Sequence, residues 1–133
     1  MSVGLLIVAH ERIAQAMVDT ADGVLGACPL PLEVLEVAGN CDPEALRHKV
    51  HDKLATLDHG EGVLVLTDLY GSTPSNIAAA SAGNPRVRMV AGMNVPMLVR
   101  IMNYADLGLD ELAAKAVSGG HDGVFACGAR GGG

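Results

Sequence analysis

The sequence predicts a three-layer α/β domain built on a mainly parallel sheet. Short aliphatic runs alternate along the 133 residues with segments in which apolar residues recur at helical spacing. Strands that alternate with helices are joined by crossover connections, and these connections make the sheet parallel. Half of the residues are hydrophobic but only 2% are aromatic, so the core is expected to be aliphatic.

The first half of the chain supplies two strands and two helices. The continuous run VGLLIVA at 3–9 is typical of a strand that is covered on both faces. Apolar residues at helical spacing predict a helix over 11–25, and the run LEVLEVA at 32–38 has the composition of a second strand. Asp42 stands where a helix N-cap is expected, so a second helix is predicted over 44–57.

The third and fourth strands belong to the second half of the chain. The runs GVLVLT at 62–67 and RVRMVAGM at 86–93 predict these two strands. Pro74 opens the helix between them, because proline is favoured in the first turn of a helix. Pro96 opens a further helix in the same way, and this helix is expected to end at about Tyr104.

The C-terminal part is expected to hold one more helix and a short edge strand. The helix starts or continues at Asp110 and is expected to stop at Gly119–Gly120, since glycine is a poor helix former. The segment Val124–Cys127 has the composition of a strand.

Length and composition favour a single domain over residues 1–127, followed by a disordered Gly-rich tail at 128–133. The net charge of −6 argues against nucleic acid and anionic membrane surfaces as partners. The apolar run at 3–9 is too short for a signal sequence or a membrane span, so no membrane insertion is expected. Three cysteines without a CxxC spacing indicate reduced thiols in a cytoplasmic protein: Cys28, Cys41 and Cys127.

The topology brings two polar residues to one edge of the sheet. Right-handed crossovers leave few arrangements, and the flavodoxin-like strand order 2-1-3-4 is predicted. In this order strands 1 and 3 are neighbours, and the winding reverses between them. Ligands of open α/β sheets bind outside the carboxyl ends of the strands at such a switch point. His10 follows the first strand and Asp68 follows the third, so we expect their side chains to face each other.

A histidine paired with a carboxylate suits nucleophilic chemistry. If Asp68 accepts a hydrogen bond from Nδ1–H, it fixes the ring tautomer and leaves the Nε2 lone pair pointing outward. The same carboxylate would stabilise the cationic ring that forms when Nε2 bonds to phosphorus, so His10 is the candidate phosphoryl acceptor. Taken singly, His10 also fits a structural role and Asp68 a turn; their joint placement favours a functional site.

Gly71, Ser72 and Thr73 are the candidate phosphate-binding residues. They lie at a helix N-terminus, where free backbone N–H groups favour an anion, and two of them add hydroxyls. The chain contains no GxxxxGK[ST] pattern, which argues against nucleotide hydrolysis. No metal-ligand spacing or cofactor motif stands out, and His48 and His51 are expected on a solvated helix surface.

Three segments resemble the IIA component of the mannose-type sugar phosphotransferase system: IVAHE at 7–11, TDLYGSTPSN at 67–76 and AGMNVPML at 91–98. The resemblance runs over nearly the whole chain. It implies a phosphohistidine formed on Nε2 of His10, with Asp68 as its carboxylate partner. The implied donor is the histidine-phosphorylated carrier protein HPr, and the implied acceptor is a IIB domain or subunit.

The resemblance also implies a homodimer in which a C-terminal strand crosses to the partner's sheet. Gly119–Gly120 would then be the hinge, and Val124–Cys127 the exchanged strand. The family loop often reads Gly-Gly-Thr/Ser-Pro, whereas this chain has Ser72 at the second position. Its Cβ is expected to alter the phosphate cradle slightly.

The resemblance leaves the biological role open. Because a Gly-rich tail follows the domain, the chain is expected to be a free-standing IIA protein. One alternative is a regulatory module whose His10 phosphorylation controls a partner instead of sugar uptake. Another is the phosphocarrier subunit of dihydroxyacetone kinase, although the loop TDLYGSTPSN favours the mannose-type branch. The sequence does not predict which sugar is transported.

Overall fold

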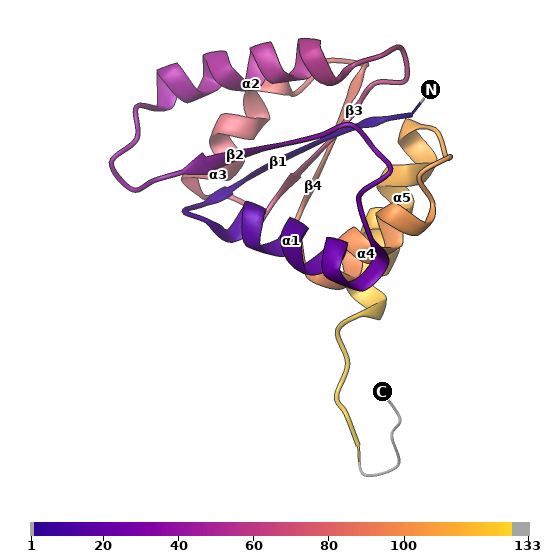
Figure 1. Ribbon diagram of the computed structural model, residues 1–133. Coiled ribbons are helices and arrows are strands. Elements are labelled where there is room, and N and C mark those ends of the chain that lie inside the picture. The colour runs from indigo at the N-terminus through magenta and orange to yellow at the C-terminus, as the bar shows by residue number, and fades with distance from the viewer. Residues whose placement is uncertain (1, 129–133) are drawn as a thin grey trace.

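The computed structural model describes residues 2–128 and contains one four-stranded sheet (Figure 1). The strands are β1 (Gly4–His10), β2 (Leu32–Val37), β3 (Val63–Thr67) and β4 (Val87–Ala91). All neighbouring strands are parallel, and their order is β2-β1-β3-β4. The predicted α/β class and the predicted strand order are therefore confirmed.

Helices cover both faces of the sheet and make the three layers (Figure 1). One face carries α2 (Pro43–Leu57) and α3 (Thr73–Ala78), and a short 3₁₀ turn over Ala79–Ser81 follows α3. The other face carries three helices: α1 (Ile13–Leu25), α4 (Val95–Asn103) and α5 (Leu109–Asp122).

The sheet is buried on both sides because its central strands present apolar side chains to both helix layers. In β1, Leu5 and Ile7 belong to the core under α1, α4 and α5, whereas Leu6 and Val8 belong to the core under α2 and α3. This alternation is the period of two of an extended strand. It explains why β1 is apolar from Gly4 to Ala9, before it ends at His10, as the sequence predicts for a doubly covered parallel strand.

Helix starts follow local chemistry that the sequence carries. The Asp42 carboxylate accepts a hydrogen bond from the Glu44 backbone N–H at 3.1 Å, and Pro43 occupies the first helical position. Asn94 caps α4 in the same manner, with its Oδ1 2.9 Å from the Met97 backbone nitrogen. The predicted cap of α2 is therefore confirmed.

The expectation that Gly119–Gly120 ends the last helix is wrong, while the hinge implied there depends on strand exchange and stays a prediction. Both glycines lie inside α5 and are buried, and the helix continues to Asp122. A Cβ on Gly119 would lie 2.4 Å from the Cβ of Arg100, and one on Gly120 would lie 2.9 Å from Cε of Met97. These glycines allow α5 to approach α4 closely, and this packing outweighs the poor helix propensity of glycine.

The segment Val124–Cys127 forms no strand in this single chain, contrary to the edge strand expected there. Its residues are exposed, and Figure 1 shows the chain leaving the body of the domain after α5. An exchanged strand needs a partner's sheet, so strand exchange stays a prediction. The tail expected at 128–133 lies outside the described residues, apart from Gly128. Among the described residues, no helix is both long and apolar enough to cross a bilayer.

Candidate functional site

The adjacency of β1 and β3 brings His10 and Asp68 together at the carboxyl end of the sheet, as the strand order predicts. Val8 and Thr67 are register partners, so His10 and Asp68 both follow at the same edge. The Nδ1 atom of His10 lies 2.8 Å from Oδ2 of Asp68. The backbone N–H of His10 donates to the same oxygen at 3.1 Å. One carboxylate oxygen therefore holds the ring and the main chain of His10.

This arrangement leaves the far side of the imidazole available. The His10 side chain is 39% exposed, whereas that of Asp68 is 11% exposed. With Nδ1–H donating to Asp68, the lone pair of Nε2 points away from the carboxylate. The other carboxylate oxygen, Oδ1, accepts from the backbone N–H of Leu69 at 3.0 Å. Partial burial works to raise the pKa of Asp68, but its hydrogen bonds with the His10 ring and backbone leave that pKa below its ordinary value.

The loop after Asp68 is braced from within. Gly71 has a φ of 83°, and its N–H donates to the buried Oγ of Ser75 at 3.2 Å. The Ser72 backbone N–H and hydroxyl both donate to the carbonyl of Leu69. Of the three predicted phosphate-binding residues, Thr73 alone keeps both its N–H and its hydroxyl out of the hydrogen bonds formed among residues 2–128. Gly71 and Ser72 shape the loop instead.

Two residues at the site are missing from the sequence prediction. Ser75, 2% exposed, anchors the loop through Gly71. Glu11 has a φ of 47°, in the left-handed region, where a residue with a side chain costs about 1–2 kcal/mol. The expected helix over 11–25 starts instead at Ile13, because the chain turns sharply at Glu11. The only sequence signal for this turn is the very short connection from His10 to the helix.

The site lies on an open surface. Leu69 and Tyr70, which follow Asp68, are 62% and 81% exposed. Exposed apolar and aromatic side chains beside an accessible histidine suit contact with another protein. Among residues 2–128, no group of three or more His, Cys, Asp or Glu side chains is placed to hold a metal ion.

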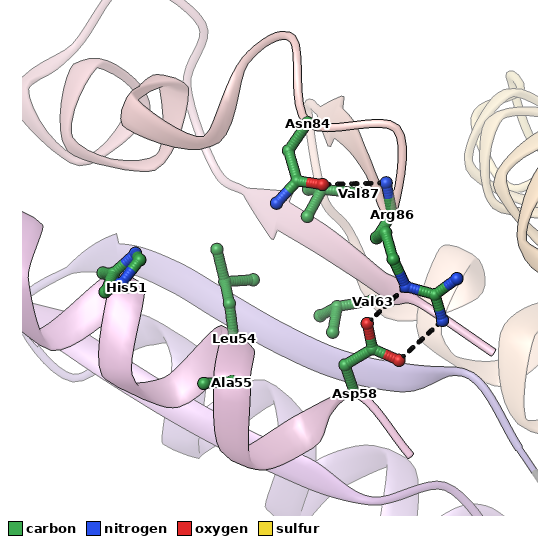
Figure 2. A pocket seen from close by; sticks show the side chains of 8 residues that line it. All are labelled: His51, Leu54, Ala55, Asp58, Val63, Asn84, Arg86 and Val87. Atoms are coloured by element: carbon green, nitrogen blue, oxygen red, sulfur yellow. Dashed lines mark hydrogen bonds and ion pairs between the residues drawn. The ribbon is translucent and has the colours of Figure 1, made fainter. Parts of the chain in front are cut away.

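A hollow of about 290 Å³ lies at the opposite end of the sheet (Figure 2). It lies between α2 and the start of β4, and its charged groups pair with each other. Nε of Arg86 is 2.7 Å from Oδ2 of Asp58, and Nη2 is 2.9 Å from Oδ1. The same carboxylate accepts from the N–H groups of Gly60 and Gly62. These contacts join the turn after α2 to the start of β4, so the charged groups in this hollow have a structural role.

Comparison with known proteins points to one family. The family model described as "PTS system fructose IIA component" matches residues 4–117. The mannose-specific EIIAB component of the phosphotransferase system (PTS) of Escherichia coli K12 is 34% identical over 129 residues, which cover 95% of this chain. The chain spans only 40% of the length of that relative.

Solved structures agree with this match. The mannose/sorbose-specific IIA subunit from Enterococcus faecalis is 26% identical and has a TM-score of 0.83, with 95% of each chain covered. A phosphotransferase system EIIA component from Streptococcus agalactiae has a TM-score of 0.82 at 21% identity, covering 93% of this chain and 96% of its own, and supports the fold alone.

Proposed function

The chain belongs to the mannose/fructose-type IIA family of the sugar phosphotransferase system, and from this membership we propose that it carries a phosphoryl group on His10. The proposed donor is a histidine-phosphorylated HPr-type carrier protein. The proposed acceptor is a IIB domain or subunit. The exchange takes place in the cytoplasm between proteins and needs no cofactor.

The observation that carries this proposal is the 2.8 Å contact between Nδ1 of His10 and Oδ2 of Asp68, with the ring still 39% exposed. In the forward step the Nε2 lone pair of His10 attacks phosphorus, and the phosphorus–nitrogen bond of the donor histidine breaks. The donor ring keeps the electron pair of that bond. The positive charge that develops on the His10 ring is stabilised by Asp68, which remains ionised.

The loop residues supply the proposed phosphate cradle. The backbone N–H and hydroxyl of Thr73 are available to phosphoryl oxygens, and Thr73 opens a helix whose dipole favours a negative group. Gly71 and Ser72 support the cradle by fixing the loop, through Ser75 and Leu69. The open surface around His10 supports exchange with proteins, since a second histidine must reach Nε2.

The same proposal includes a homodimer with an exchanged C-terminal strand. In the described chain β4 is at one edge of the sheet, so one side of it is open to pairing. A hollow of about 230 Å³ beside this edge is lined mainly by apolar groups, among them Val90, Met97, Val117 and Val124. Light scattering should report a dimer, and truncation after Gly123 should yield a monomer. A monomeric full chain would contradict this part of the proposal.

Incubation with histidine-phosphorylated HPr tests the proposed relay. Intact-mass analysis should report one acid-labile phosphoryl group per chain, and His10→Ala should abolish it. His51→Ala is the matched control, because this histidine is exposed on α2 and lines the hollow of Figure 2. Uptake by the His10→Ala variant would contradict the proposal. Addition of a IIB protein then distinguishes a transport relay, which loses its phosphoryl group, from a regulatory module, which retains it.

A further inference from the structure

Glu11 adopts a backbone conformation that residues other than glycine rarely adopt. Its φ of 47° makes it the one non-glycine residue with positive φ between residues 2 and 128. It directly follows His10, and α1 begins two residues later at Ile13. Strained backbone of this kind persists where surrounding contacts hold it, and such positions cluster at functional sites. The hydrogen bonds of Glu11 should therefore indicate the role of this strained conformation.

The contacts of His10 and Glu11 reach both neighbouring strands. The His10 N–H donates towards β3, to Oδ2 of Asp68 at 3.1 Å. The Glu11 N–H donates in the other direction, to the carbonyl of Val37 at the end of β2, at 2.9 Å. The Glu11 carboxylate then accepts from the N–H of Gly39 at 3.2 Å. The turn that carries His10 is thus held on both sides.

We propose that Glu11 is a positioning residue for His10: its carboxylate, anchored on Gly39, holds the strained turn so that Nδ1 stays on Asp68 during phosphoryl exchange. This inference rests on the function proposed above for His10. Glycine would adopt the same φ with less strain, but it has no side chain to reach the loop after β2. The role that we assign to Glu11 is that of a hydrogen-bond acceptor, so its negative charge is not required.

Three substitutions of Glu11 distinguish the effects of its hydrogen-bond acceptor, its negative charge and its backbone strain. Glu11→Gln keeps an acceptor for Gly39 and should accept phosphate at nearly the wild-type rate. Glu11→Ala removes the acceptor and keeps the strain. It should slow uptake from phosphorylated HPr by about tenfold, the lower end of the effect of losing the hydrogen-bond partner of a metal-bound histidine. Glu11→Gly also removes the acceptor but relieves the strain. It should slow uptake equally, with a thermal midpoint that is unchanged or higher.

Ring ¹⁵N NMR gives a readout that does not need phosphoryl transfer. In the wild type and in Glu11→Gln, the His10 spectrum should report one dominant tautomer with the proton on Nδ1. In Glu11→Ala and Glu11→Gly, it should report a mixture. Glu36→Ala is the matched control, because Glu36 is an exposed carboxylate near the end of β2 whose side chain makes no hydrogen bond within residues 2–128. This control should match the wild type in both rate and spectrum.

The outcomes are distinct for the two proposals. Wild-type rate and spectrum in Glu11→Gly would overturn the positioning role, as would a Glu11→Gln variant that is as slow as Glu11→Ala. A Glu11→Gly variant that is clearly faster than Glu11→Ala would also overturn it. Relief of backbone strain, without the hydrogen bond to Gly39, would then be enough to hold His10 in place. If the wild-type protein takes no phosphoryl group, the function proposed for His10 fails, while the tautomer measurement still decides the role of Glu11.

Discussion

Two aspartates at opposite ends of the sheet each accept hydrogen bonds from a nitrogen-bearing side chain, but their partners differ: a guanidinium for Asp58 and an imidazole for Asp68. Asp58, at the amino end of β3, is held by Arg86 and by the N–H groups of Gly60 and Gly62. Asp68, at the carboxyl end of β3, is held by His10 and by the N–H of Leu69. Arginine stays protonated, whereas a histidine that donates through Nδ1 keeps a free lone pair on Nε2. The partner therefore decides which pair is suited only to a structural role and which also suits the phosphoryl transfer that we propose.

The pKa values of the two aspartates are also set by their different partners. The hydrogen bonds from the Arg86 guanidinium hold the pKa of Asp58 well below its usual range, and the Gly60 N–H adds to this effect. Burial opposes the lowering at Asp68, but the hydrogen bonds with His10 still leave its pKa below the ordinary value. The hollow of Figure 2 also lies at the Asp58 end, whereas the site that we propose lies at the other. If phosphoryl transfer at His10 is borne out, the concave surface at the Asp58 end is not the functional site.

Gly4→Ala should produce the largest loss of stability and little change in the site. The new Cβ would lie 2.5 Å from the carbonyl oxygen and 2.9 Å from the Cβ of Leu57, at the end of α2. Overpacking of this kind costs about 1–3 kcal/mol, because neither backbone nor Cβ atoms can move aside freely. Urea unfolding should report this loss, while uptake of phosphate by the folded protein at low temperature should stay near wild type.

Gly23→Ala is the control for that measurement. Gly23 lies in α1 with nothing within 4 Å of an added Cβ, so alanine should stabilise the helix by up to about 1 kcal/mol. Equal stability of the Gly4→Ala variant and the wild type would show that the amino end of the sheet is not tightly packed. A selective loss of phosphate uptake in folded Gly4→Ala would contradict the separation between the two ends.

The two aspartates provide the next test, through paired variants. Asp68→Asn should slow uptake of the phosphoryl group by about 10–100-fold, the size of effect that follows loss of the carboxylate behind a metal-bound histidine. Asp58→Asn should leave uptake unchanged, because Arg86 and the turns it holds lie far from His10 along the sheet. In urea unfolding the order should reverse, with Asp58→Asn the less stable variant. Uptake that falls equally in both variants would contradict the comparison.

The placement of His10 beside Asp68 was predictable from the sequence, because it depends on the order of the strands in the sheet. Alternating strands and helices predict that β1 and β3 are neighbours, and this adjacency places His10 beside Asp68. The N-cap at Asp42 was predictable for a similar reason, since capping depends on local chemistry alone. Contacts set by order or by local chemistry can be inferred without coordinates.

Contacts set by tertiary packing could not be inferred in this way. Gly119 and Gly120 suggest a helix end in sequence, yet they remain helical because α4 packs directly against them. Ser72 is a residue type that often binds anions at a helix N-terminus, but its hydroxyl already donates to the carbonyl of Leu69. The left-handed turn at Glu11 has no propensity signal, because glutamate is not favoured there.

The smallest expected effect is a difference in how the two ends respond to acid. Both aspartates have a folded pKa below the unfolded value of about 3.9, so the contacts of each ionised carboxylate contribute their stability above that pH. The contribution is lost as the pH falls through the folded pKa. The hydrogen bonds from Arg86 hold the pKa of Asp58 well below its usual range, whereas burial opposes the lowering at Asp68. The advantage of the wild type over Asp58→Asn should therefore persist to lower pH than its advantage over Asp68→Asn. Urea unfolding of the wild type and both variants from neutral pH into the acid range measures this. Advantages that vanish together would mean that His10 holds its carboxylate as firmly as Arg86 does, and the division between a reactive end and a structural end would lose its electrostatic basis.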